Sequence, residues 1–478
     1  MKNSVPENSL TKKKQSLPTT SSMIKYFMVF FLCSLFVSTV MAAASSGESW
    51  KYMLFHQGPY TDMYMDFFNS IRDGGSPDVY SGRNNIYPPL CILIFRIFSK
   101  LIDPELVSST FPQRKLLQID QISAMIYIIF AIICVMSLMR LIESYANIQS
   151  VGKKKTLASV ISFAMIVSYP VMFCLERGNI LILSVVFAMF FIFFKDSENK
   201  IIREISYIAL ALSAAIKIYP AIFGLSLIIE KKYNQAIRLM IYGIVIVAVP
   251  FVFFIDEFKT NPAMITQSAL SMLSIGNTIP LSGEANSVFE KLIKNILNFA
   301  MNKKNGLNFS SVSIQNFVFM AGGSSSVAKA LCMVTEGIAV VSAFFVKREW
   351  QRTFLLAYLM LNIPSASNSY ALSFLIIPFM IFLFQKQEYR SKDWIYLWCY
   401  ALILTPLPTL WFYHPDIVKK IAAFFGAYYN TQLNQYLGTA VVQFMFFFIV
   451  IETVNEVLKR RKAKKAEAES IAVTEEAA

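Results

Sequence analysis

Long apolar runs recur along the chain from one end to the other, and short polar or basic gaps separate them. An α-helix needs about 20 consecutive apolar residues to cross the hydrocarbon of a bilayer, and the longer runs reach this length. The pattern therefore predicts an all-α polytopic membrane protein with about 12 transmembrane helices. We expect these helices at about residues 24–44, 118–141, 156–174, 179–195, 204–217, 219–231, 236–255, 326–346, 352–364, 370–386, 393–411 and 437–457.

The composition excludes the soluble classes of protein. Hydrophobic residues make up 55% of the 478 residues, and charged residues make up only 15%. A soluble domain carries about 25% charged residues, so this chain cannot cover several domain surfaces with polar groups. The formal net charge of +14 is typical of nucleic-acid-binding proteins. The basic residues, however, lie in the short gaps between apolar runs, so we expect no nucleic-acid partner.

The distribution of positive charge predicts the topology. Seven alternate polar segments hold 27 of the 44 Lys and Arg residues in about 78 positions, whereas the proposed outer loops hold about 14 in about 168 positions. Cytoplasmic loops carry the excess of basic residues, so both termini are predicted to be cytoplasmic in a multi-pass protein of the plasma membrane. The segments predicted to be cytoplasmic are 1–25, 140–155, 195–203, 231–238, 347–352, 386–392 and 459–465.

The chain is predicted to consist of one membrane domain, residues 23–458, between two polar tails. We expect residues 1–22 to form a disordered basic tail, and residues 459–478 to form a charged tail. Two long loops, at about 45–117 and 256–325, are predicted to lie outside the membrane. Long outer loops favour an enzyme that acts at the outer face.

Several runs are shorter than a full crossing requires. Residues 204–217 and 219–231 are joined by Lys217-Ile218-Tyr219-Pro220, which indicates either two broken helices or one tilted helix. Broken helices are tolerated where they border a protein-buried or watery cavity, so this break is a candidate site. Residues 87–102 carry Arg96 and Lys100 after a double proline, and we expect them to be re-entrant or interfacial.

Candidate catalytic acids lie in the first outer loop. Asp62 and Asp66 are four residues apart, which would place both on one face of a helix. A carboxylate that is partly removed from water at a membrane surface among aromatic residues is suited to act as a general base. The alternative is an ordinary solvated loop helix.

Two candidate cations interrupt apolar runs. Arg177 belongs to the sequence Glu176-Arg177-Gly178-Asn179, and Lys217 precedes Tyr219. Charges at such depth are costly unless they are paired or face a cavity, so they could hold a phosphate. Alternatively, both side chains extend towards lipid headgroups. A third polar break, residues 362–370, contains Asn368 and is either a sugar-hydroxyl site or a bare loop.

Metal and triad chemistry is not expected. The chain has only two histidines, His56 and His414, and its six cysteines show no CxxC spacing. Two histidines make a histidine-based zinc site or a Ser-His-Asp triad a poor fit to this chain. We therefore predict no metal and no cofactor.

The order of these elements resembles glycosyltransferase family 87, which comprises integral-membrane GT-C enzymes typified by polyprenol-phosphate-mannose-dependent α-(1,2)-mannosyltransferases. The resemblance extends over residues 55–235. It rests on the acidic first loop that ends in Tyr87-Pro88-Pro89, the Arg177-Gly178-Asn179 element, Lys217-Ile218-Tyr219-Pro220 and the basic turn at Lys231-Lys232. The family's later polar break often carries Trp and His, whereas this chain has Ser367 and Ser369 there.

The resemblance implies a GT-C-like helical bundle and a metal-independent transfer of a hexose, mannose in the typical members. The donor would be a polyprenyl-phosphate sugar, and the acceptor would be a glycan or glycolipid outside the cytoplasm. The expected site residues have three roles. Asp66, or Asp62 in its place, would be the general base, and Arg177 and Lys217 would bind the donor phosphate. The substrate pocket would contain Asn179, Tyr219, Tyr87 and Asn368.

Two other functions fit parts of the sequence. A transporter or flippase of a lipid-linked or small solute would line its path with intramembrane charges. The two long outer loops and the absence of an evident repeat count against it. An O-antigen ligase-like membrane enzyme would act on a diphosphate-linked oligosaccharide, and donor preference would distinguish it.

The topology can be tested by labelling with a membrane-impermeant thiol reagent. Single cysteines introduced near Lys154 and Lys464 are expected to react only from the cytoplasmic side, and one near Gly75 only from outside. Labelling near Lys154 from outside would contradict the twelve-helix topology, because it would make residues 87–102 a true crossing.

Overall fold

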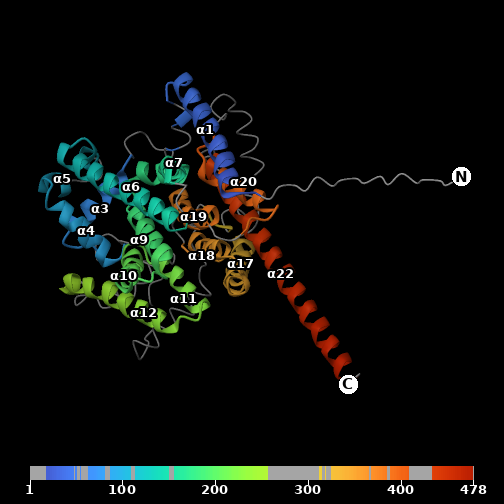
Figure 1. The fold of residues 1–478 in the computed structure, drawn as a ribbon. Coiled ribbons are helices and arrows are strands. Elements are labelled where there is room, and N and C mark those ends of the chain that lie inside the picture. The colour runs from blue at the N-terminus through green and yellow to red at the C-terminus, as the bar shows by residue number, and fades with distance from the viewer. Residues whose placement is uncertain are drawn as a thin grey trace.

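The computed structural model describes residues 18–47, 49, 50, 54, 63–80, 87–108, 113–149, 155–256, 312–314, 318, 325–364, 368–384, 388–408 and 433–476. Within these residues the chain forms helices and turns, and no strand (Figure 1). The α-helices are α1 (Thr20–Ala44), α3 (Met65–Gly75), α4 (Pro89–Ser99), α5 (Pro104–Ser108), α6 (Gln121–Gln149), α7 (Lys155–Ile166), α8 (Tyr169–Arg177), α9 (Leu181–Phe194), α10 (Lys200–Ile216), α11 (Leu225–Ile229), α12 (Tyr233–Ala248), α17 (Ser325–Phe345), α18 (Glu349–Asn362), α19 (Ile376–Phe384), α20 (Asp393–Leu404) and α22 (Leu433–Glu476). Short 3₁₀ helices are η2 (Gln113–Gln118), η3 (Tyr219–Gly224), η4 (Val249–Phe254) and η5 (Ser369–Leu375).

Four of the described helices are long and apolar enough to cross a membrane: Thr20–Ala44, Gln121–Gln149, Tyr233–Phe254 and Leu437–Glu469. Helices α7 and α8 together are also long and apolar enough to cross, but the chain bends by 45° at the break between them. They would make a fifth crossing if both halves belong to one span. The all-helical membrane prediction is therefore confirmed, whereas the count of about 12 is not.

Many of the remaining apolar helices are short. Helix α9 has 14 residues and α4 has 11, which gives lengths of about 21 and 16 Å at 1.5 Å per residue. The interruption predicted near Lys217 is present, because α10 ends at Ile216 and η3 begins at Tyr219. Helix α4, within residues 87–102, is by itself shorter than a crossing helix.

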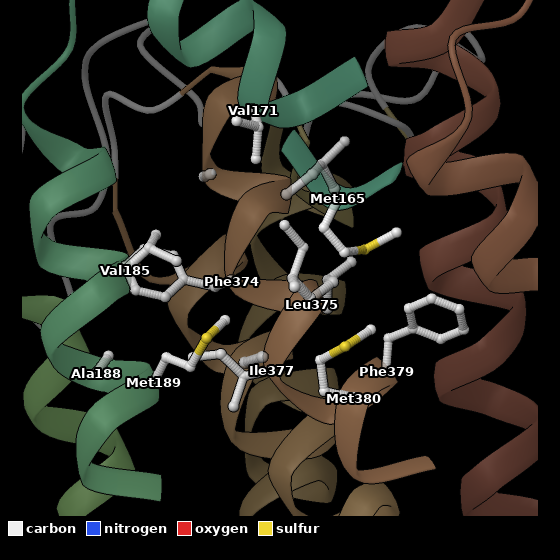
Figure 2. Packing of buried hydrophobic residues seen from close by; sticks show 14 of the residues in the cluster. Met165, Val171, Val185, Ala188, Met189, Phe374, Leu375, Ile377, Phe379 and Met380 are labelled. Carbon is white, nitrogen blue, oxygen red and sulfur yellow. The ribbon is translucent and has the colours of Figure 1, made fainter. Parts of the chain in front are cut away.

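Helix α19 forms the centre of the fold. All nine of its residues are buried, and a helix that is apolar on every side must be surrounded by protein or lipid. Figure 2 shows Phe374, Leu375, Ile377, Phe379 and Met380 of η5 and α19 beside residues of α7, α8 and α9. At about 14 Å, α19 is only half as long as a crossing helix. Its protein surroundings explain why the polar break at 362–370 is tolerated inside the bundle.

Residues in or directly beside the segments predicted to be cytoplasmic contact one another through ion pairs. Glu230, at the end of α11, accepts hydrogen bonds from Lys195 at 2.7 Å and from Lys232 at 2.6 Å. Arg352 of α18 approaches the same carboxylate at 3.3 Å. Arg348 and Asp393 form a bidentate pair with distances of 2.5 and 2.7 Å, and both side chains are buried. These pairs hold the ends of several helices together at one end of the bundle.

Helices extend into both predicted tails, and parts of the predicted tails and loops lie outside the described residues. Helix α22 continues to Glu476, so most of the predicted C-terminal tail is helical and extends from the body of the molecule (Figure 1). Helix α1 begins at Thr20, inside the predicted N-terminal tail. Residues 1–17 and most of the loop predicted at 256–325 lie outside the described residues.

Candidate active site

The carboxylate of Asp66 is the centre of the candidate site. Asp66 lies in the first turn of α3, and its Oδ1 accepts a hydrogen bond from Nη2 of Arg177 at 2.7 Å. Its Oδ2 accepts one from Nδ2 of Asn179 at 2.8 Å. The Arg177 and Asp66 side chains are 13% and 21% exposed, so the ion pair is largely shielded from water. Arg177 therefore does not extend to lipid headgroups, which was the alternative.

The turn between α8 and α9 places both partners of Asp66. Helix α8 ends at Arg177, and Gly178 follows in the left-handed conformation, with φ of 65°, that commonly terminates helices. The buried Asn179 then accepts a hydrogen bond from the Leu181 amide at 3.0 Å through its Oδ1. This bond leaves its Nδ2 to donate to Asp66. The sequence Arg-Gly-Asn thus turns the chain and presents two donors to one carboxylate.

Gly178 is also the point of closest approach between this turn and α3. A Cβ atom at Gly178 would lie 2.9 Å from the carbonyl oxygen of Tyr64 and 2.9 Å from Cβ of Phe67. The Tyr64 amide donates to the Glu176 carbonyl at 2.8 Å, and Tyr64 itself has a φ of 59°. The backbone contact fixes the start of α3 against the end of α8.

The expectation that Asp62 and Asp66 share a helical face stays a prediction. The left-handed Tyr64 lies between them and caps α3, which begins only at Met65. The backbone hydrogen bond from Tyr64 to Glu176 holds the chain out of helical geometry just before α3. Asp62 itself lies outside the described residues.

Lys217 supplies a second cation beside the carboxylate. It occupies the break between α10 and η3, and its Nζ lies 4.0 Å from the centre of the Tyr87 ring. Among the described residues, no carboxylate lies within ion-pair distance of this ammonium group, although Asp66 is close enough to interact with it electrostatically. A partly buried lysine held over an aromatic face, with no ion-pair partner, can bind an anionic group from outside the chain.

Tyrosines line the space around these charges. Burial, followed by the charge of the nearby Asp66, raises the pKa of Tyr87 well above its usual range, so the phenol stays neutral and its ring remains a π surface for Lys217. Tyr219 and Tyr370 are also near Tyr87. Asn368 caps η5, and its Oδ1 accepts from the Ser369 amide at 2.7 Å, which places Tyr370 on the first turn.

The site is built from helix ends. Asp66 lies at the start of α3, Tyr219 at the start of η3 and Tyr370 at the start of η5. Tyr87 lies two positions before α4, and Arg177 is the last residue of α8. Helix ends leave backbone groups without intrahelical partners, so they create polar surroundings inside an apolar bundle. The arrangement combines one oriented carboxylate, one ammonium group without an ion-pair partner and several aromatic faces. These groups suit proton acceptance next to an anionic leaving group.

The structure brings together most of the residues that the sequence singled out: Asp66, Arg177, Asn179, Lys217, Tyr87 and Tyr219 converge, and Asn368 is two residues from Tyr370. The direct pairing of Asp66 with Arg177 was not predicted. Tyr370 was also not predicted as a site residue. Its position as the last residue of the polar break at 362–370 could have indicated it. Among the described residues, no group of three or more His, Cys, Asp and Glu side chains could hold a metal ion. His56 and His414 lie outside them.

Comparison with known families supports the resemblance. Residues 85–278, about two fifths of the chain, match the model of Glycosyltransferase family 87. The matched segment contains Tyr87, Arg177, Asn179, Lys217 and Tyr219, but it begins after Asp66. No curated protein and no solved structure matches the chain. The family match and the apolar helices together indicate a membrane glycosyltransferase.

Substituting Gly178 tests whether its close approach positions the site. Gly178→Ala is expected to lower the free energy of unfolding by about 1–3 kcal/mol, because a Cβ atom opposes the left-handed conformation and clashes with Tyr64 and Phe67. Thermal unfolding in detergent would measure this loss. Gly243→Ala in α12 is the matched control, since no atom lies within 4 Å of its added Cβ, and it is expected to be neutral or slightly stabilising. Equal stability of the two variants would contradict the positioning role.

Proposed function

We propose that this protein transfers a hexose, mannose in the simplest case, from a polyprenyl-phosphate sugar to a glycan or glycolipid hydroxyl at the outer face of the plasma membrane. The observation that carries the proposal is the meeting of Asp66 with Arg177, Asn179 and Lys217. The last three residues belong to the segment that matches the glycosyltransferase family. The GT-C-like bundle and the independence from metal belong to the same proposal.

Asp66 is proposed as the general base. A carboxylate offers about four lone-pair sites, so the two hydrogen bonds from Arg177 and Asn179 leave acceptor capacity on both oxygens. The acceptor hydroxyl would give its proton to Asp66 while its oxygen forms a bond to the anomeric carbon of the donor. The bond from that carbon to the phosphate oxygen breaks in the same step. The two donors hold the carboxylate in one orientation, which a base needs to act efficiently.

Lys217 is proposed to bind the phosphate that departs. Breaking the sugar–phosphate bond leaves additional negative charge on the polyprenyl phosphate, and a nearby ammonium group stabilises it. Arg177 is proposed to position the base through the hydrogen bond from its Nη2, and its positive charge adds to the attraction for the phosphate. Tyr87, Tyr219 and Asn368 would shape the sugar pocket.

The direct test is an assay with purified protein in detergent. Polyprenyl-phosphate mannose is offered together with candidate glycan and glycolipid acceptors, and products are identified by mass spectrometry. Parallel reactions contain a nucleotide sugar or a diphosphate-linked oligosaccharide. Transfer from the monophosphate donor alone supports the proposal. Transfer only from the diphosphate donor would favour the O-antigen ligase-like function, and transport into proteoliposomes without transfer would favour the transporter.

Removal of the base is expected to abolish transfer. Asp66→Asn keeps the size of the side chain but removes its ability to take a proton, so the rate should fall by a factor of about 10² to 10⁴. Donor binding and the size-exclusion profile should be unchanged. Asp62→Asn is expected to cost less. Asp73→Asn near the other end of α3 is the control and should keep full activity. Full activity of the Asp66→Asn variant would contradict the carboxylate mechanism.

Removal of the second cation is expected to weaken use of the donor. Lys217→Ala should cost about 2–4 kcal/mol in kcat/KM for the donor, because the ammonium group faces a phosphate where little water competes. Lys200→Ala, on the exposed first turn of the same helix α10, is the matched control. In Arg177→Ala the loss should include kcat, because Asp66 loses one of its two donors. Unchanged kinetics in both the Lys217 and Arg177 variants would return these cations to a purely structural role.

A further inference from the structure

A cavity of about 430 Å³ lies beyond the candidate active site, at the opposite end of α3. Gly74 and Gly75 at the end of α3 form one wall, and Arg96 and Lys100 at the end of α4 form another. Phe253, Phe254 and Asp256, from η4 and the residues after it, complete the lining. Asp66 lies eight residues before Gly74, about 12 Å along the helix axis. The cavity is therefore separate from the carboxylate that the proposed transfer uses.

Arg96 is held in place as a fixed cation. Its Nε donates to the Gly74 carbonyl at 3.0 Å, and its Nη2 donates to the Ser76 carbonyl at 3.2 Å. Its guanidinium carbon lies 4.6 Å from the centre of the Phe254 ring. Five N–H donors are available on a guanidinium, and these two bonds use only part of them. The guanidinium thus lines the cavity in a set orientation, with donors left for a ligand.

Lys100 adds a second positive charge at the rim. Its side chain is exposed, and among the described residues it has neither an ion pair nor a side-chain hydrogen bond. Asp256 contributes a negative charge to the described part of the same lining, which disfavours a ligand with two negative charges. A phosphodiester carries one negative charge, whereas a phosphomonoester carries about −1.5 to −2 at neutral pH. The charge of the lining fits the diester.

The apolar part of the lining lies at the boundary of a membrane span. The span Tyr233–Phe254 ends at the cavity, and the Phe253 side chain is 66% exposed. Val252 beside it is 63% exposed. Exposed aromatic and aliphatic side chains at the end of a span contact lipid, while neighbouring cations lie at headgroup level. A ligand that fills this cavity can therefore have an acyl or isoprenoid chain against Phe253 and a phosphate against Arg96.

We infer that this cavity is a binding site for a phosphodiester group of a membrane lipid, with Arg96 and Lys100 on the phosphate and Phe253 against the chain. The site is distinct from the proposed catalytic centre and does not require that centre to act as a transferase. Gly74 is part of the recognition, because a Cβ atom there would lie 2.6 Å from the Arg96 amide nitrogen and would displace α4 from α3.

The test is native mass spectrometry of the full chain in detergent, titrated with dioleoyl phosphatidylglycerol as the phosphodiester. Dioleoylglycerol lacks the phosphate, and dioleoyl phosphatidic acid carries a monoester. Soluble glycerophosphoglycerol has the same diester without chains. We expect the wild-type chain to bind phosphatidylglycerol most tightly. Lys100→Gln should weaken it about fivefold, the effect of one basic residue near a lipid headgroup. Lys347→Gln, at an exposed lysine elsewhere, is the matched control.

The outcomes distinguish a membrane lipid from a soluble molecule as the source of the phosphodiester. Weaker lipid binding in Phe253→Ser, with little binding of the soluble diester, supports a lipid. Equal binding of the soluble diester with the same dependence on Lys100 would keep the phosphate site but overturn the lipid. Affinity for phosphatidylglycerol that is unchanged within twofold in both Lys100→Gln and Arg96→Gln would overturn the proposal. The readout is binding, so it is independent of whether sugar transfer occurs.

Discussion

The hydrogen-bonded ion pair between Asp66 and Arg177 is the interaction on which the arrangement of the site depends. It joins α3, which precedes the family-matched segment, to the turn between α8 and α9, which lies within it. In these shielded surroundings each of the two charges compensates the other. The left-handed Gly178 allows the two backbones to come close enough for this pairing. The same contacts therefore form the polar centre and pack α3 against the turn between α8 and α9.

Short helices explain how so many polar groups meet inside an apolar bundle. A helix that crosses the membrane without interruption satisfies its own backbone groups and presents only side chains. Here η3 and η5 begin in the interior and α8 ends there, so capping residues such as Asn179 and Asn368 lie beside the charged groups. The buried α19 packs against this irregular region, and all nine of its residues are buried.

Local chemistry in the sequence predicted a good part of this structure. Apolar length indicated the helices, and the break at Lys217-Ile218-Tyr219-Pro220 appears between α10 and η3. Arg177, Asn179 and Lys217 were recognised because charged and amide side chains are conspicuous in apolar surroundings. The pairing of Asp66 with Arg177 spans 111 residues, and no local pattern encodes which distant groups meet. The helix start at Met65 likewise depends on the tertiary contact of Tyr64 with Glu176. The number of crossings was not predictable either, since apolar runs of half-crossing length also form re-entrant and buried helices.

The two ends of the helical bundle differ in how they are joined. At one end, Glu230 is shared by Lys195, Lys232 and Arg352, and Arg348 is locked to Asp393. At the other end, the ion pair of Asp66 with Arg177, the hydrogen bond from Asn179 and aromatic contacts join the elements around Asp66. One end is thus held by several cations that share one carboxylate, whereas the other depends on the pair of Asp66 and Arg177. A substitution that removes the charge of Glu230 would therefore leave three cations without the carboxylate that they share.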